Sequence, residues 1–227
     1  MHVNVITLFP ELFPGPLGVS VVGKALGIHW DLHVIALRDF GIDRHKIVDD
    51  TPFGGGAGMV LRPDVVDCAL RSIPEMQRGQ VIYLSPRGAQ LTQEKAATIA
   101  KTSNFSLICG RFEGIDQRVI DAWDIEEVSI GDFVLSGGEP AKYCLIDAAV
   151  RLIPGVLGNK ASLDNETFTD FLLEHPQFTR PQVWEGLSVP SVLVSGNHAE
   201  INAWRKKESA DLTQKRRPDL WEKHLKK

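Results

Sequence analysis

The stretch Phe105-Ser106-Leu107-Ile108-Cys109-Gly110-Arg111-Phe112-Glu113-Gly114 joins a short apolar run to a glycine-rich turn. Such a run, almost wholly apolar, is typical of a strand that is covered on both faces. Glycine in the turn permits positive φ angles and lets a ligand approach the backbone closely. The stretch therefore predicts a buried strand followed by a turn that can hold a ligand.

Similar runs recur through the first two thirds of the chain. Apolar, β-branched segments lie at residues 2–8, 33–37, 80–84, 105–109 and 128–135. Segments with helical apolar spacing lie between or after them, at residues 63–73, 92–101, 115–123 and 141–153. The last of these ends before Pro154, whose ring and missing N–H forbid continuation. This alternation predicts an α/β domain with a mostly parallel sheet.

The sequence changes character after Pro154. Residues 155–168 are rich in Gly, Ser, Asp and Asn and show little periodicity, which predicts a linker or loop. Beyond them, residues 168–173 and the segment from Ala199 to the end show helical patterns. The expected organisation is an α/β domain over residues 1–157, a linker over 158–168 and a small helical domain over 169–227.

The composition favours a soluble protein of the cytoplasm. With 227 residues, 43% of them hydrophobic, the chain can bury one large core or two modest ones without disulfides. Its three cysteines fit neither a secreted disulfide framework nor closely spaced zinc pairs. We expect no membrane span, because no apolar stretch is long enough, and no signal peptide.

The net charge of −4 conceals a division. Residues 205–227 carry nine Lys or Arg and four Asp or Glu, a net of +5, so the rest of the chain carries −9. A basic end is one sign of RNA binding. A solvated, lysine-rich helix produces the same count, and on charge alone that is the more common case.

Three glycine-rich turns lie beside the predicted strands, at residues 52–58, 109–114 and 135–139. None has the spacing of a dinucleotide-binding or P-loop motif, so the turns do not point to a pyrophosphate or triphosphate. Two of them follow successive strands, and α/β sheets bind ligands beyond the carboxyl ends of their strands. A ligand there would rest on backbone amides.

An acidic segment lies near the first glycine-rich turn. Asp39, Asp43, His45, Asp49 and Asp50 fall within about a dozen residues. Their oxygens could hold Mg²⁺. The alternative, which is more common for such a segment, is a polar loop in which aspartates pair with arginines.

Nine motifs span nearly the whole chain in order. They are residues 8–13 (Leu-Phe-Pro-Glu-Leu-Phe), 43–50 (Asp-Arg-His with Asp-Asp), 53–59 (Phe-Gly-Gly-Gly-Ala-Gly-Met), 83–86 (Tyr-Leu-Ser-Pro), 109–116 (Cys-Gly-Arg-Phe-Glu-Gly-Ile-Asp), 129–139 (Ser-Ile-Gly-Asp-Phe-Val-Leu-Ser-Gly-Gly-Glu), 153–158 (Ile-Pro-Gly-Val-Leu-Gly), 179–181 (Thr-Arg-Pro) and 193–198 (Leu-Val-Ser-Gly-Asn-His). Together they resemble the bacterial tRNA (guanine-37-N1)-methyltransferases, the TrmD type of the SPOUT superfamily.

The resemblance implies an enzyme that transfers a methyl group from S-adenosylmethionine to N1 of guanine 37, next to the anticodon, in tRNA. It also implies a deep trefoil knot in the α/β domain, and a homodimer with its active site at the subunit interface. The helical domain would bind tRNA, and a mobile linker would join it to the knotted domain. The family's expected Mg²⁺ dependence has no dedicated site that the sequence identifies.

By the same resemblance, the knot loops would bind the methyl donor. The expected donor-binding residues are Tyr83, Leu84, Ser85, Pro86, Gly110, Glu113, Ile130, Gly131, Asp132, Phe133, Val134, Leu135, Ser136, Gly137 and Gly138. The alternative interpretation concerns four of them, which would be core residues in any α/β protein: Tyr83, Leu84, Ile130 and Leu135.

The reaction needs a base for the N1 proton and a cation near O6, where negative charge develops. The resemblance places the catalytic arginine at Arg151; the plain alternative is a helix-surface pair with Asp147. It places the base at Glu166, where relatives usually have aspartate, with Asp164 as the alternative base.

The expected tRNA contacts are Arg180, His198, Arg205, Lys206 and Lys207. Two other function classes share many of these features. One is a noncatalytic RNA-binding module, which Arg151, the linker carboxylate and the glycine-rich turns disfavour. The other is a knotted methyltransferase acting on rRNA or on a ribose 2′-hydroxyl, which would need no base for guanine N1.

Overall fold

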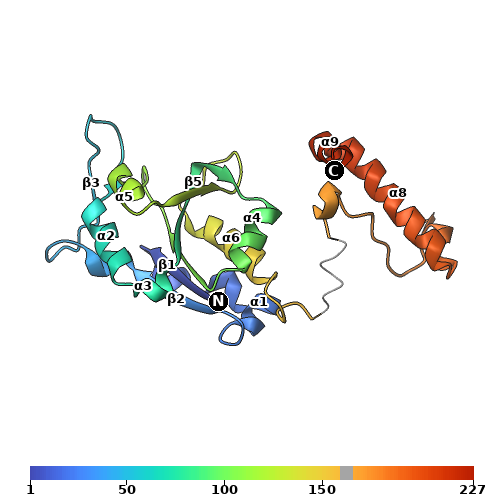
Figure 1. Ribbon diagram of the computed structural model, residues 1–227, viewed down its shortest axis with the longest axis horizontal. Helices are drawn as coiled ribbons and strands as arrows, with labels where there is room; N and C mark the ends of the chain where they lie inside the picture. Colours follow the sequence, from blue (N-terminus) through green and yellow to red (C-terminus); the bar gives the residue numbers. More distant parts are fainter. Residues whose placement is uncertain (159–165) are drawn as a thin grey trace. The chain divides into compact units, whose positions relative to one another are not determined.

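The structure is a computed structural model that describes residues 1–158 and 166–227 (Figure 1). The chain divides into two compact units, Met1–Gly158 and Asn159–Lys227, called here the N-terminal and C-terminal units. Among the described residues, no helix is both long enough and apolar enough to cross a membrane.

The N-terminal unit is built on a five-stranded sheet with the order β2-β1-β6-β5-β7. Its strands are β1 His2–Thr7, β2 Asp31–Ala36, β5 Gln80–Gln90, β6 Asn104–Ile108 and β7 Glu126–Ser129. All neighbouring strands run parallel, and Val5 of β1 lies opposite Val34 on one side and Leu107 on the other. The predicted α/β class with a parallel sheet is confirmed.

Helices cover both faces of this sheet (Figure 1). One layer contains α1 Ser20–Ala25, α4 Gln93–Ala100 and α6 Glu139–Val150; the other contains α2 Pro63–Arg71 and α5 Gln117–Ala122. Because side chains alternate along a strand, Val5 of β1 joins the core under α6, whereas Ile6 joins the core under α2. The strands are therefore buried on both faces.

Local signals explain where the predicted helices begin. The Thr92 hydroxyl accepts a hydrogen bond from the Lys95 N–H at 3.2 Å and caps α4. Asp116 caps α5 in the same way, through the Arg118 N–H at 2.9 Å. Pro63 occupies the first turn of α2, where its missing N–H costs nothing.

Shorter elements complete the N-terminal unit. They are α3 Glu75–Arg78, the antiparallel pair β3 Asp49–Asp50 and β4 Val60–Leu61, and the 3₁₀ helices η1 Pro10–Leu12, η2 Gly15–Gly18 and η3 Leu37–Phe40.

Two strand ends differ from the prediction by more than two residues. The strand expected over 128–135 ends at Ser129, because Gly131 has a φ of +148° and the Phe133 N–H turns back to the Gly131 carbonyl at 3.0 Å. The strand expected over 80–84 continues to Gln90 after an irregularity between Leu84 and Ala89. Both changes lie in β5 and β7, which are neighbours in the sheet.

The C-terminal unit consists mainly of α8 His198–Arg216 and α9 Pro218–Leu225. A small hairpin, β8 Val183–Trp184 with β9 Leu187–Ser188, and the 3₁₀ helix η5 Ser191–Val194 precede them. The Asn197 side chain caps α8 by accepting the Ala199 N–H at 3.2 Å.

The helix predicted over 168–173 is wrong, since this segment forms only the 3₁₀ turn η4 Thr169–Phe171. Phe168, Asp170 and Phe171 have positive φ angles, which an α-helix does not allow. Contacts with the two long helices replace the missing helical bonds. The Leu173 N–H donates to the Thr213 hydroxyl at 2.8 Å, and His224 Nδ1 lies 2.9 Å from the Asp170 carbonyl.

Candidate active site

A pocket of about 360 Å³ lies at the carboxyl ends of β5, β6 and β7. The irregular middle of β5 and the turns that follow β6 and β7 form its walls. Every predicted donor-binding residue except Asp132 lines it: Tyr83, Leu84, Ser85, Pro86, Gly110, Glu113, Ile130, Gly131, Phe133, Val134, Leu135, Ser136, Gly137 and Gly138. The structure thus brings together residues that lie up to 55 positions apart in the sequence.

The Tyr83 side chain explains why the residue at position 110, in the turn after β6, is glycine. Its side chain is buried under the turn, and a Cβ on Gly110 would lie 2.6 Å from the Tyr83 ring and 2.7 Å from its hydroxyl. Any larger residue at 110 would displace the ring. Burial raises the pKa of Tyr83, so the phenol is protonated at neutral pH.

Arg111 links two of the three turns. Its guanidinium donates to the Ser136 carbonyl at 3.2 Å and forms an ion pair with Glu139 at 2.7 Å. It also lies over the Phe9 ring at 4.5 Å. A Cβ on Gly137 would fall 2.3 Å from the Arg111 guanidinium carbon, so the arginine fills the space that glycine leaves. A main-chain bond from the Gly138 N–H to the Gly110 carbonyl, 2.9 Å long, joins the same turns.

Beneath these turns lies a buried polar cluster. Glu139, 1% exposed, accepts a hydrogen bond from the Thr7 hydroxyl at 2.8 Å. Lys142 is completely buried, and its Nζ has no hydrogen-bond partner in the part of the chain that the structure describes. Burial lowers the pKa of Lys142, against the opposing influence of Cys109 and Glu139. Burial also raises the pKa of the Cys109 thiol to about 11.

The charges that line the pocket leave a negative balance. Three lining residues are charged, namely Arg87, Arg111 and Glu113. Arg87 pairs with Glu127 at 2.9 Å and Arg111 pairs with Glu139, whereas the Glu113 carboxylate makes no ion pair with any described residue. The uncompensated charge of the pocket is therefore negative, which suits a cationic ligand.

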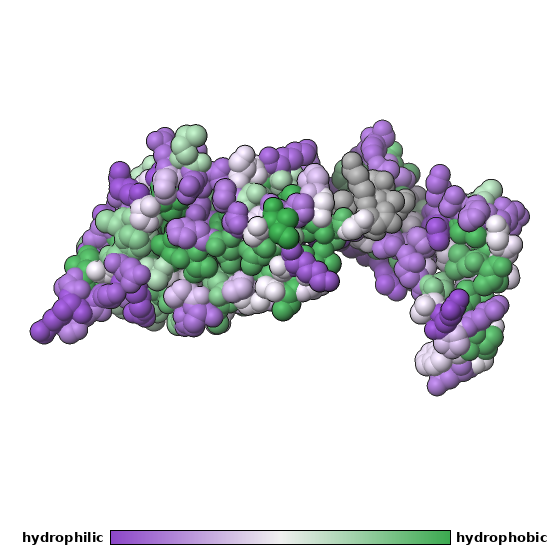
Figure 2. All heavy atoms as spheres, turned by 90° about the horizontal axis from the view of Figure 1, so that it is seen from below, coloured by the Kyte–Doolittle hydropathy of each residue, from purple (hydrophilic) through white to green (hydrophobic). Residues whose placement is uncertain are grey.

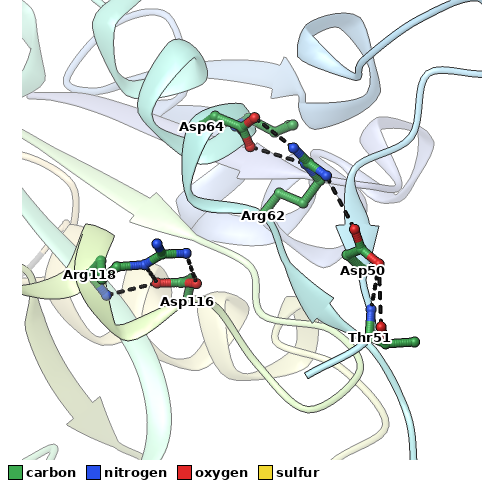
Figure 3. Close-up of polar contacts among 7 residues, drawn as sticks. Asp50, Thr51, Arg62, Asp64, Asp116 and Arg118 are labelled. Atoms are coloured by element: carbon green, nitrogen blue, oxygen red, sulfur yellow. Dashed lines mark hydrogen bonds and ion pairs between the residues drawn. The ribbon is translucent and has the colours of Figure 1, made fainter. Parts of the chain in front are cut away.

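The glycine-rich loop at residues 52–58 adjoins Glu113. A Cβ on Gly58 would lie 2.4 Å from Glu113 Oε1, and the Glu113 N–H donates to the Met59 carbonyl at 2.9 Å. Figure 3 shows how the two ends of the loop are held. Arg62, just after β4, binds Asp50 of β3 at 3.2 Å and Asp64 of α2 at 2.9 Å. Arg62 holds the pKa of Asp64 below its usual value.

The acidic segment before this loop is internally paired. Lys46 binds Asp39 at 3.0 Å, and the Asp43 carboxylate accepts the His45 N–H at 2.9 Å. With Asp50 held by Arg62, the contacts agree with the polar-loop alternative. Within the described ranges, no group of three or more His, Cys, Asp or Glu side chains is arranged to hold a metal ion.

The predicted catalytic residues do not line the pocket. Arg151 directly follows α6, its N–H donating to the Asp147 carbonyl at 3.2 Å. It lies ten residues along the chain from Ala141, which lines the pocket, so the helical rise separates the two by roughly 15 Å. Glu166 is half-buried and belongs to the C-terminal unit. Asp164, the alternative base, lies outside the described residues.

The predicted tRNA contacts all lie in the C-terminal unit. Arg180 and Arg205 line a second pocket, of about 400 Å³. His198 is the first residue of α8, and Lys206 and Lys207 are exposed on the same helix.

The sequence reasoning assigned no role to Arg87, Arg111 or Lys142. Arg111 and Glu139 belong to two separate glycine-rich turns, 28 positions apart, and no local pattern indicates that they pair. Lys142 lies three residues before the buried Leu145, on the buried side of α6, so helical periodicity predicts its burial.

Fold and pocket together define a class. The molecule is an α/β protein that offers a negatively charged pocket for a small ligand at the carboxyl ends of its parallel strands.

Comparison with known proteins makes the assignment specific. Residues 1–223 match the family model described as "tRNA (Guanine-1)-methyltransferase TrmD". The chain is 51% identical, over 226 residues, to the tRNA (guanine-N(1)-)-methyltransferases of Brucella ovis and Brucella melitensis, covering 99% of this chain and 93% of each relative. It is equally similar to the Brucella suis enzyme, of which it covers 92%.

The chain belongs to the TrmD family of tRNA (guanine-1)-methyltransferases. It is an enzyme of that activity, the methylation of guanine 37 in tRNA with S-adenosylmethionine as the methyl donor.

Proposed function

We propose that the pocket at the ends of β5, β6 and β7 binds S-adenosylmethionine. Its volume of about 360 Å³ lies in the range of small-molecule sites. Gly110, Gly137 and Gly138 line the pocket, and Tyr83, Leu84 and Ile130 provide apolar walls. The single observation that carries the proposal is the Glu113 carboxylate, which forms no ion pair with any described residue, because the donor's sulfonium is a cation.

When bound, the donor supplies an electrophilic methyl group. The Glu166 carboxylate accepts the N1 proton of guanine as the N1 electron pair forms the new bond to the methyl carbon, and the methyl–sulfur bond breaks toward sulfur. Arg151 donates hydrogen bonds to O6, where negative charge develops as the proton leaves. Asp164 is the alternative base. This assignment carries the family's residue roles onto the chain.

The active site lies at the interface of a homodimer in this proposal. Arg151 lies roughly 15 Å along the chain from the pocket residue Ala141, farther than an arginine side chain extends. A second copy can bring its own Arg151 to the pocket, and the exposed Phe133, Val134 and Leu135 provide apolar surface for such a contact. The dimer is tested by analytical ultracentrifugation of the active enzyme, for which we expect a mass of two chains.

The proposal also includes the family's trefoil knot around the donor-binding turns and a tRNA-binding role for the C-terminal unit. The contacts to tRNA would come from Arg180, His198, Arg205, Lys206 and Lys207. The enzyme would act in the cytoplasm, where tRNA is modified. Residues for a Mg²⁺ site are not assigned.

The substitution Glu113→Gln tests the donor site. It removes the negative charge and keeps the side-chain size. We expect titration calorimetry to show roughly tenfold weaker binding of S-adenosylmethionine, because a nearby charge pair contributes about 1.4 kcal/mol, and little change for S-adenosylhomocysteine, whose sulfur is neutral.

Glu75→Gln on α3, an exposed acid outside the pocket, is the matched control and should change neither affinity. Equal weakening of both ligands by Glu113→Gln would show that the carboxylate does not recognise the sulfonium charge.

A further inference from the structure

The second pocket lies wholly within the C-terminal unit. Its volume is about 400 Å³, and it lies between the segment 175–182, the residues around Leu193 and the first half of α8. Figure 2 shows hydrophobic side chains of this unit reaching the surface between hydrophilic ones. A pocket of this size accommodates a small organic group.

An aromatic ring forms part of its wall. Phe178 lines the pocket and is 47% exposed. Trp204 supports it from behind, with the two ring centroids 6.1 Å apart, and also meets His175 edge-on at 6.2 Å. The Phe178 ring is thus held in place and still accessible, as a platform for stacking must be.

The charge of the pocket is positive. Arg180 and Arg205 line it, and none of the lining residues that the structure describes is acidic. Neither arginine forms an ion pair with a described residue, and Lys206 and Lys207 follow Arg205 on α8. The nearby Glu174 accepts a hydrogen bond from Gln177 at 2.6 Å. Burial and the charge of Arg205 lower the pKa of His175, which keeps this ring neutral at pH 7.

A flat apolar wall beside two cations matches an unpaired nucleotide. The base face can stack on an aromatic ring while arginines bind the adjoining phosphate. A paired nucleotide cannot offer the face of its base, because that face is stacked inside the helix. The target guanine must itself reach the methyl donor, so the occupant of this pocket is a different nucleotide.

We propose that this pocket receives one unpaired nucleotide of the tRNA other than the methylated guanine, with its base on Phe178 and its phosphate on Arg180 and Arg205. The inference rests on the proposed function, in which the C-terminal unit binds tRNA. It adds a subsite for a base to a surface whose other proposed contacts with tRNA are mostly with phosphates.

The test combines protein variants with single-base deletions in the RNA. Full-length wild-type protein is titrated with a tRNA transcript that has guanine at position 37, and with transcripts that lack one base at each unpaired position in turn. We expect one abasic transcript besides that at position 37 to bind about five- to a hundredfold more weakly, the range for loss of one stacked base. In Phe178→Ala that penalty should disappear, because the ring is already absent.

Two further variants keep the result interpretable. Phe178→Leu preserves apolar volume but has no flat face, so it should lose the same penalty while retaining the wild-type circular dichroism spectrum. Trp184→Ala removes an exposed aromatic ring of the same unit that does not line the pocket, and should keep the penalty.

The proposal is overturned if Phe178→Ala and Phe178→Leu retain the abasic penalty. It is also overturned if they alter the mass measured by light scattering while tRNA affinity is unchanged, since the pocket would then be a protein interface. Methylation of the intact transcript by the wild-type enzyme tests the proposed function separately, so its absence would identify a failure at that earlier step.

Discussion

The arginines that line the pockets of the two units differ in whether they form ion pairs. In the N-terminal unit, Arg87 and Arg111 line the pocket at the ends of β5, β6 and β7, and both are paired with glutamates. In the C-terminal unit, Arg180 and Arg205 line the second pocket without an ion pair to any described residue. The first arrangement shapes a pocket around a small ligand, and the second leaves positive charge available to a polyanion. Counted by unit, residues 1–158 carry a net charge of −5 and residues 159–227 carry +1, so the excess of positive charge belongs to residues 205–227 and not to the C-terminal unit as a whole.

The largest expected effect is a loss of methylation rate, which tests whether the C-terminal unit supplies the catalytic base as well as binding tRNA. In Glu166→Gln the amide cannot accept the N1 proton, so we expect the single-turnover rate of tRNA methylation to fall by about 10²- to 10⁴-fold. The affinity for tRNA, measured by filter binding, should change little, because the substitution keeps the side-chain size.

Asp164→Asn is the matched control and should leave the rate near that of the wild type. An unimpaired Glu166→Gln together with a slow Asp164→Asn would move the base to Asp164. If both variants methylate tRNA at the wild-type rate, neither Glu166 nor Asp164 is the base, and the role of the C-terminal unit is limited to tRNA binding.

The next effect tests whether charge pairing stabilises the turns that line the pocket of the N-terminal unit. Glu139→Gln retains an acceptor for Thr7 but leaves the Arg111 guanidinium without its counter-charge. We expect a loss of roughly 3 kcal/mol in the free energy of unfolding of the N-terminal unit, the lower end for a broken buried pair, because Arg111 keeps some solvent contact.

Hydrogen exchange of β6 and α6 amides reports this unit separately from the other. Thr7→Val removes the hydroxyl's bonds to Glu139 and to the Phe9 N–H and leaves the ion pair, so it should cost only about 1–2 kcal/mol. Equal effects of the two substitutions would show that the hydrogen bond, and not the charge pair, is the main contribution.

Lys142 is the exception within the N-terminal unit, a buried amine without a hydrogen-bond partner among the described residues. Its pKa is lowered from the ordinary value of 10.5, so the native state binds this proton more weakly than the unfolded chain does. Wild-type stability therefore falls as the pH drops below about 10.5 toward the native pKa.

Lys142→Met removes the amine with similar volume. We expect it to stabilise the N-terminal unit by about 1–3 kcal/mol at pH 7.5, with a smaller gain at pH 10. The comparison is made with Cys109→Ala in both proteins, because Cys109 and Lys142 influence each other's pKa. A destabilised variant would show that Lys142 has an interaction worth more than its burial costs.

Sequence reasoning located the pocket because its signals are local. Apolar runs predict strands, and glycines after them predict turns that ligands can approach. The same signals misplaced one strand end, because Phe133, Val134 and Leu135 read as strand residues although they are exposed beside the pocket. Hydrophobicity alone does not separate a core position from one that faces a ligand or a partner.

Long-range charge pairing was beyond local signals. Arg111 and Glu139 are 28 positions apart and meet only when the turns after β6 and before α6 are joined by the Gly138–Gly110 bond. The positive φ angles that break the helix expected at 168–173 depend on packing against α8 and α9. The roles of Arg151 and Glu166 came from the family resemblance alone, since neither residue stands in a local pattern that specifies catalysis.

The smallest expected effect concerns the exposed cations of α8. If Lys207 contacts a phosphate, Lys207→Ala should weaken tRNA binding less than tenfold near 0.1 M salt and lower the slope of log affinity against log salt by about 0.7–0.9. Fluorescence anisotropy of labelled tRNA from about 0.05 to 0.3 M salt measures that slope. Arg87→Ala removes a cation that Glu127 already neutralises, and should leave the slope unchanged. If the two substitutions change the slope equally, the contrast between paired and unpaired cations does not govern RNA binding, and the net charge of the whole chain is the better description.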